Sequence, residues 1–161
     1  MMNMKINLVP VKNQEFDTLF SVVKQGLYSH VDTVFGWCDH FQRERLINEY
    51  DPHWFNWIYV EEMCVGMLCF KPYEDAIHVH MLVIFPEFQK RKFGEKVMKH
   101  VHEIARKQKR NQVTLSSFVC NESATKFYKS LGYQVMPDSD ENFLSLAFKV
   151  DFHKPYKHIR H

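Results

Sequence analysis

The sequence carries little net charge and few cysteines, and its N-terminus lacks a long apolar run. Among its 161 residues, 21 lysines and arginines stand against 19 aspartates and glutamates, a formal net charge of +2. Such a chain lacks the overall field of a polyanion-binding protein, so we expect no nucleic-acid partner and look for local charge clusters instead. The cysteines form no CxxC pair, which predicts reduced thiols and a cytoplasmic protein: Cys38, Cys64, Cys69 and Cys120.

Signal-like segments, membrane spans, repeats and interdomain linkers are also missing from the sequence. We therefore expect no membrane partner. The length suits one domain with a real core. The sequence predicts a single domain over residues 1–152, followed by a basic C-terminal tail, residues 153–161.

Hydrophobic periodicity predicts an α/β fold, a mixed central sheet flanked by helices in the order β α α β β β α β α β β. Helical spacing begins near Phe16, is interrupted over residues 26–37 and resumes over residues 39–49. A hairpin over residues 54–73 has its turn at Glu61–Glu62, and Gly66 marks a bulge or a close approach. The remaining elements are strands 4–11, 76–85, 112–119, 133–136 and 143–152, and helices 94–107 and 121–132.

A cluster of cations stands where a helix is predicted to begin, in the stretch EFQKRKFGEKV of residues 87–97. Helix N-termini favour negative charge, so Lys90, Arg91 and Lys92 are out of place there unless they meet an anion. The free N–H groups of a strand-to-helix turn can bind a phosphate. A solvated basic loop is the alternative.

A second motif follows one strand later. In NESATKFYKSLGY, Asn121 is a predicted helix cap and Gly132 a helix stop. Together the two stretches resemble the acetyl-coenzyme A signature of the GNAT superfamily of N-acetyltransferases, a Q/R-x-x-G-x-G/A loop and then N-x-x-A-x-x-F-Y-x-x-L-G-Y/F. Lys92 replaces a loop glycine of that family, and Glu95 a small residue. The matching positions are Gln89, Gly94, Asn121, Ala124, Phe127, Tyr128, Leu131, Gly132 and Tyr133.

The resemblance implies a site for acetyl-coenzyme A. The N–H groups of residues 91–95, Phe93 and Gly94 included, would hold the pyrophosphate, with the neighbouring cations neutralising its charge. Pantetheine would bond to the backbone of Leu82 and Ile84. The other implied cofactor contacts are Gln89, Lys90, Asn121, Ala124, Phe127 and Tyr128.

The resemblance also implies catalytic roles. Tyr128 would protonate the departing thiolate, and the N–H of Leu82 would bind the oxyanion. His78 and His80 lie two apart on a strand and titrate in the range of a base at neutral pH. This His-x-His is similar to the paired histidines of arylalkylamine N-acetyltransferases. Without the family, Tyr128 would be a core residue and the histidines surface or packed residues; we expect no metal, since no third ligand is apparent.

The acceptor pocket is expected within residues 26–42, where the family builds it. Tyr28, Phe35 and Trp37 could form an apolar wall, and Asp32 or Asp39 could hold a cationic amine. We expect acetyl transfer to a primary amine of a small molecule, by direct transfer in a ternary complex. A peptide or protein amine, and a non-catalytic coenzyme A sensor, are the alternatives. Nothing in the sequence decides whether the chain forms a homodimer.

Overall fold

A computed structural model describes residues 5–152 of the chain, so the predicted tail, residues 153–161, lies outside the described residues. The described part contains one mixed seven-stranded sheet with the strand order β1-β2-β3-β4-β5-β7-β6. The elements are β1 (Ile6–Pro10), η1 (Asn13–Glu15), α1 (Phe16–Phe35), α2 (Asp39–Glu49), η2 (Pro52–Trp54), β2 (Phe55–Val60), β3 (Met63–Tyr73), β4 (Ala76–Ile84), η3 (Pro86–Phe88), α3 (Phe93–Lys107), β5 (Gln112–Phe118), α4 (Glu122–Ser130), β6 (Gln134–Val135) and β7 (Phe143–Lys149).

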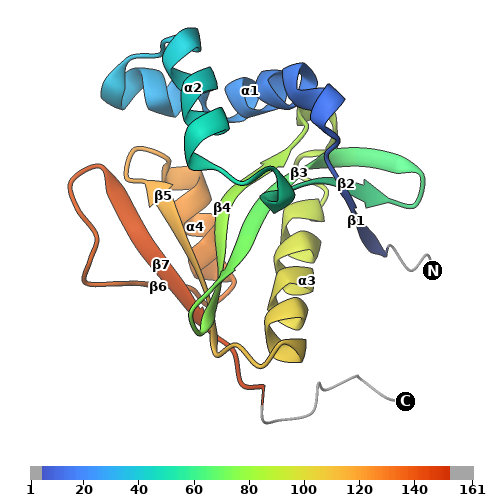
Figure 1. Cartoon of the computed structure of the whole chain (residues 1–161). Coiled ribbons are helices and arrows are strands. Elements are labelled where there is room, and N and C mark those ends of the chain that lie inside the picture. Colours follow the sequence, from blue (N-terminus) through green and yellow to red (C-terminus); the bar gives the residue numbers. More distant parts are fainter. Residues whose placement is uncertain (1–4, 153–161) are drawn as a thin grey trace.

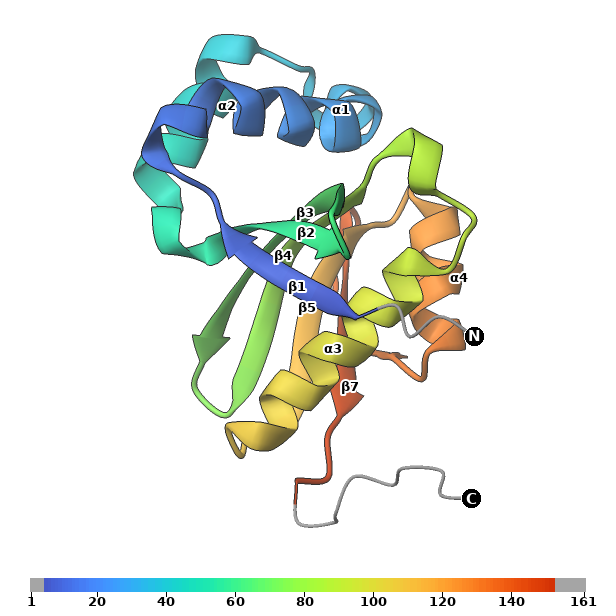
Figure 2. The ribbon, with the colours of Figure 1, turned by 90° about the vertical axis from the view of Figure 1, so that its right-hand side faces the viewer.

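Helices cover both faces of the sheet (Figures 1 and 2). On one face, α3 and α4 pack over a core that includes Val97, Val101 and Tyr128. On the other face, α1 and α2 enclose a second core around Phe20 and Met67. The predicted fold class is therefore confirmed, a single α/β domain with a mixed sheet between helices.

The predicted interruption of the first helix is wrong. Residues 26–35 continue α1, which runs for 20 residues from Phe16 to Phe35. Val23 and Val31 stand two helical turns apart and are both buried, so the apolar period persists through residues with poor helix propensity. Gly26 lets α1 approach the sheet, because a Cβ there would lie 2.7 Å from a side-chain methyl group of Val83.

The close approach predicted at Gly66 is confirmed. A Cβ at this position of β3 would lie 2.0 Å from the carbonyl oxygen of Val83 in β4. The predicted cap of α4 is confirmed as well, because the Asn121 side chain accepts a hydrogen bond from the N–H of Ala124 at 3.1 Å. Both residues fix elements that border the site described below.

Candidate functional site

A β-bulge interrupts the pairing of β4 with β3. Cys69 of β3 pairs with Met81 and Phe70 pairs with Val79, which leaves His80 with no residue opposite it. Such a bulge reverses the alternation of side chains along a strand. Odd-numbered apolar side chains of β4 accordingly face α3 before the bulge and α1 after it.

The parallel strands β4 and β5 separate at the same point. Their pairing covers Ala76–Val79 of β4 and Gln112–Leu115 of β5. Beyond it, β4 continues to pair with β3, and residues 116–118 of β5 pair with β7. Figure 1 shows the two strands diverging toward α1 and α2. The edge of β4 at Leu82 and Ile84 is thereby left without a strand neighbour on the β5 side.

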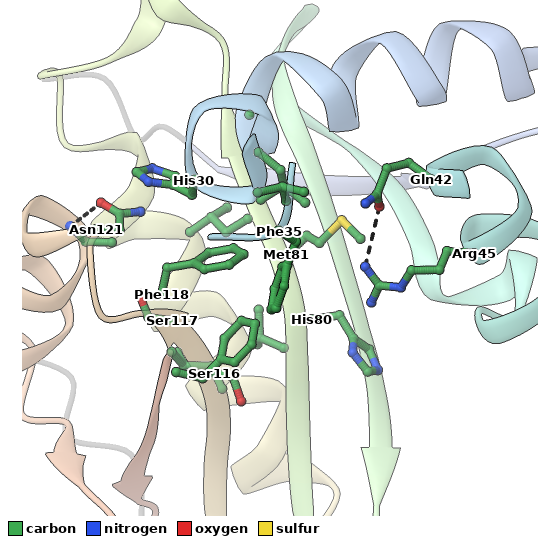
Figure 3. A pocket seen from close by; sticks show the side chains of 18 of the residues that line it. His30, Phe35, Gln42, Arg45, His80, Met81, Ser116, Ser117, Phe118 and Asn121 are labelled. Carbon is green, nitrogen blue, oxygen red and sulfur yellow. Dashed lines mark hydrogen bonds between the residues drawn. The ribbon is translucent and has the colours of Figure 1, made fainter. Parts of the chain in front are cut away.

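A cavity of about 930 Å³ occupies this split. Its walls come from α1, α2, β4, β5 and α4, and Figure 3 shows their side chains converging on it. Of the predicted catalytic residues, all four line it: His78, His80, Leu82 and Tyr128. Asn121 and Ala124 line it too, so the cavity joins the histidine pair to the predicted cofactor helix.

The two histidines contact each other, with ring centroids 4.7 Å apart. His78 Nδ1 lies 2.8 Å from the hydroxyl oxygen of Thr114 on β5. His80 stacks on Trp54 at 5.1 Å, and its Nε2 is buried without a hydrogen-bond partner among the described residues. Burial, with the charge of Lys71 in addition, lowers the pKa of His78. Burial lowers the pKa of His80 to about 4, so both rings are neutral at pH 7 and can accept a proton.

Tyr128 lies across the cavity on α4. Its side chain is only 9% exposed, and burial raises the pKa of the phenol to about 12. The hydroxyl makes no side-chain hydrogen bond within the described residues, and it is not one of their fully buried unpaired atoms, so it opens to the cavity that Tyr128 lines. A protonated, unpaired hydroxyl at a cavity wall is suited to donate to a ligand.

The basic loop adopts an anion-binding geometry. Lys90 and Lys92 both have left-handed backbone angles, with φ of 61° and 65°. Lys92 precedes α3, and its carbonyl accepts the first helical N–H, that of Lys96, at 3.2 Å. The N–H groups of residues 93–95 therefore stand ahead of the helical hydrogen bonds and can bind a ligand. Lys92 thus takes the conformation that a glycine would adopt at lower cost.

Two contacts hold this loop in place. Gln89 donates its side-chain amide to the carbonyl oxygen of Ile84 at 2.8 Å, which fastens the loop to the end of β4. Gly94 faces the ring of Phe127, where an added Cβ would lie 3.3 Å from the nearest carbon, so the start of α3 lies directly against α4. The guanidinium of Arg91 lies over the rings of Phe88 and Phe93, at 5.7 and 5.6 Å.

The loop cations are free to meet an external anion. No ion pair in the described part of the chain involves Lys90, Arg91 or Lys92. Glu95, the nearest acid on α3, pairs with Lys99 at 3.0 Å instead. Unpaired N–H groups and unpaired cations therefore occur together, as a pyrophosphate requires.

Among the predicted acceptor residues, Phe35 lines the cavity, whereas Tyr28 and Asp32 on α1, and Trp37 in the turn after it, are not among the residues of its wall. Asp32 accepts a hydrogen bond from the N–H of Trp37 at 2.9 Å. The Trp37 ring lies 5.5 Å from that of Tyr28 and donates to Asp39 at 2.6 Å. These contacts connect the end of α1, where Phe35 lines the cavity, to the turn that follows it.

Several residues that line the cavity were not predicted from the sequence. Gln42 and Arg45 reach the cavity from α2, and Tyr50 follows that helix. In sequence, their spacing is that of any amphipathic helix. One signal was available: Gln42 is a polar residue on the apolar stripe that Leu46 continues.

Neither a metal site nor a membrane helix emerges from the described residues. Within residues 5–152, no three histidine, cysteine, aspartate or glutamate side chains are grouped to bind a metal ion. None of the helices in that range is both long and apolar enough to cross a membrane.

A sheet that opens between two parallel strands, beside a helix start with free N–H groups and cations, is suited to an elongated ligand that carries phosphate groups, as coenzyme A does. The comparison with protein families agrees. The model of the Acetyltransferase (GNAT) family matches residues 24–133, more than half of the chain. The chain belongs to this family and is an acetyl-coenzyme A-dependent acyltransferase.

Solved structures share the fold at low sequence identity. PaiA N-acetyltransferase from Thermoplasma acidophilum, in complex with coenzyme A, is 16% identical with a TM-score of 0.70, covering 91% of this chain and 99% of that one. The ribosomal-protein-S18-alanine N-acetyltransferase from Escherichia coli is 12% identical with a TM-score of 0.64, covering 96% and 100%. Arabidopsis thaliana Naa50, with the bisubstrate analogue CoA-Ac-MVNAL, is 16% identical with a TM-score of 0.56, covering 89% and 97%. No curated protein sequence matches the chain.

Lys92→Gly tests whether the side chain of Lys92 contacts the cofactor. Glycine keeps the left-handed backbone without strain but removes a cation, so the affinity for coenzyme A should fall roughly twofold to fivefold at low salt. The salt dependence of binding should weaken in parallel. Calorimetric titration measures both, with Lys92→Ala as the control that removes the charge and keeps the strain. Unchanged affinity in the glycine variant would show that the side chain of Lys92 makes no favourable interaction with the phosphates.

Proposed function

We propose that the protein transfers the acetyl group of acetyl-coenzyme A directly to a primary amine of a small molecule within a ternary complex. The single observation that supports this best is the cavity in the split sheet. A neutral histidine pair lines it from β4, and the Tyr128 hydroxyl belongs to α4. The two protons that the reaction must move therefore have an acceptor and a donor among the residues of one cavity.

The residues along the split have separable roles in this proposal. The loop of residues 89–95 binds the pyrophosphate, and the open edge of β4 at Leu82 and Ile84 bonds to the pantetheine arm. The N–H of Leu82 stabilises the oxygen on which negative charge develops. When bound, acetyl-coenzyme A supplies the activated acetyl group and the thiol leaving group. Tyr128 donates a proton to that sulfur, for which its raised pKa keeps it protonated.

His78 is the better placed of the two histidines to act as the base. If its Nδ1–H donates to Thr114, at 2.8 Å, its Nε2 lone pair remains available for the amine proton. His80 Nε2 is buried, and its ring is packed against Trp54 and Tyr50. His80 therefore holds the ring of His78 and accepts protons only through a water or a small rearrangement.

The aromatic contact between Phe35 and Phe143, two residues that line the cavity, favours a small acceptor over a peptide. The ring of Phe35, at the end of α1, stacks on Phe143 of β7 at 6.1 Å and so bridges the two sides of the opening. Phe143 packs in turn on Phe118 of β5, at 4.7 Å. A peptide chain would have to displace this aromatic bridge. A homodimer remains a prediction.

Binding and turnover test the proposal together. Calorimetric titration should give saturable binding of acetyl-coenzyme A, and a panel of small primary amines should produce free thiol. Peptides with free N-termini form the second arm of the panel. Binding without thiol release from any amine would leave the sensor alternative, and release with peptides alone would reassign the acceptor.

His78→Ala should change the pH dependence of turnover. A base must be unprotonated to act, so kcat/KM should rise with pH through the pKa of His78, which lies below the usual histidine value of 6.5. The variant should lose that limb and about 10²-fold in kcat at pH 7. His40→Ala is the control, because His40 lies exposed on α2. A pH–rate profile equal to that of the parent would place the base elsewhere.

A further inference from the structure

The α2 wall of the cavity carries a guanidinium whose partners are poorly engaged. Arg45 Nη1 lies 3.5 Å from the amide oxygen of Gln42, Nη2 lies 3.3 Å from the hydroxyl oxygen of Tyr50, and Nε lies 3.4 Å from Glu49. N–H···O hydrogen bonds centre on about 2.9–3.0 Å, so all three contacts are long. Arg45 therefore keeps most of its capacity for a stronger acceptor.

Arg45 also packs against an aromatic ring and lies beside a buried amide. Its guanidinium lies 5.8 Å from the centroid of the Tyr50 ring. Gln42 beside it is 8% exposed, one of the few buried polar side chains of the described residues. Figure 3 shows Gln42 and Arg45 extending from α2 toward Met81 and His80 of β4. A planar donor held over a cavity matches a carboxylate, which it can bind through two parallel hydrogen bonds.

The electrostatics of the cavity floor favour an anion as well. Burial is the main cause of the lowered pKa of His80, and the charges of Lys71 and Arg45 lower it further, so the charged groups that act on this ring are cations. A positive potential repels an ammonium ion and lowers the pKa of an amine, which raises the fraction of the reactive free amine. The acid on this wall, Glu49, has an exposed side chain and is paired with Arg45. A negative group on the acceptor would restore the binding that an ammonium ion loses.

We infer that the acceptor carries a carboxylate, which Arg45 binds with help from Gln42 and Tyr50, so that the substrate is an amino acid or another amine with a free carboxylate. This inference rests on the proposed function. The carboxylate end would lie against α2 and direct the amine toward the histidines and the split between β4 and β5. Arg45 then determines specificity and has no part in the proton transfers.

Matched acceptors test it. Amino acids with one to five carbons between the amine and the carboxylate, and aromatic amino acids, are compared with their uncharged amides and with diamines. The parent enzyme should favour the best carboxylate over its amide about tenfold to a hundredfold in kcat/KM. Arg45→Gln should remove that preference, mainly by raising KM for the carboxylate acceptors. Arg45→Lys should keep part of it.

Arg43→Gln is the matched control, because Arg43 lies two residues away on α2 and pairs with Asp17 at 2.9 Å outside the cavity wall. It should leave the preference intact. Titration of the N-acetylated amino acid in the presence of coenzyme A gives a readout without turnover, and its affinity should fall in Arg45→Gln alone. Amides acetylated as well as carboxylates would overturn the inference and leave the proposed function standing. A preference for diamines would overturn it in favour of Glu49, and thiol release from no acceptor would overturn both.

Discussion

Tyr128→Phe should lower kcat by about 10²-fold or more while the affinity for acetyl-coenzyme A stays nearly unchanged. In the proposed mechanism the hydroxyl donates a proton to the leaving sulfur, and burial keeps it protonated by raising its pKa to about 12. The ring, which fills the core beside Phe127 at 5.0 Å, is retained in the variant. Stopped-flow or steady-state thiol release measures kcat, and calorimetry measures the affinity.

The Tyr128 hydroxyl has no evident part in stabilising the fold, so an effect of its removal on turnover can be separated from an effect on stability. Because it has no hydrogen-bond partner among the described residues, its removal should leave the free energy of unfolding unchanged or slightly raised. Tyr133→Phe is the control, since the two rings lie only 5.5 Å apart. The Tyr133 hydroxyl bonds to His102 Nε2 at 2.7 Å, so that variant should lose about 1–3 kcal/mol of stability and keep its kcat. Equal turnover in parent and Tyr128→Phe would assign Tyr128 to packing.

The parts of the fold that local chemistry specifies could be predicted from the sequence. Asn121 caps α4 because its side chain accepts from a backbone N–H three residues on, a rule that needs no tertiary contact. The turn of the β2–β3 hairpin lies at Glu61–Glu62, as its polar residues indicated. The continuation of α1 through residues 26–35 could not be predicted in this way. Its weak local propensity is overridden by burial against β4.

In the candidate site, too, the features set by local sequence could be predicted and those set by tertiary contacts could not. The predicted cofactor loop has a sequence signature, and the structure adds that Lys92 adopts the left-handed conformation that a glycine would take there. The bulge at His80 has no signature, because HVHMLVI reads as an unbroken strand. Both histidines lie on the side of α1 and α2, as alternation predicts, and the bulge turns Met81 and Val83 to that side as well. The bulge also coincides with the end of the β4–β5 pairing. The place of Arg45 in the cavity wall depends on how α2 packs over the sheet, which no short-range sequence pattern specifies.

Gly66→Ala should destabilise the protein by about 3 kcal/mol, more than a typical substitution. A Cβ would stand 2.0 Å from the carbonyl oxygen of Val83 and 3.1 Å from the Cα of Ile84, both backbone atoms that cannot rotate away. β3 and β4 would have to move apart at the segment that carries the predicted pantetheine contacts. Urea denaturation should show a lower midpoint with an unchanged slope, and the melting temperature should fall by about 6–12 °C.

Gly94→Ala is the control for Gly66→Ala, because it also replaces a glycine by alanine but brings no backbone clash. There the added Cβ meets the ring of Phe127 at 3.3 Å, a side chain that can shift, and alanine improves the helix propensity of α3. Its stability should therefore change by less than about 1 kcal/mol. If Gly66→Ala were equally mild, β3 would be able to move away from β4 at little cost. The affinity of Gly66→Ala for coenzyme A should be measured as well. If it falls together with the free energy of unfolding, the predicted pantetheine edge of β4 depends on the absence of a side chain at Gly66 of the neighbouring strand.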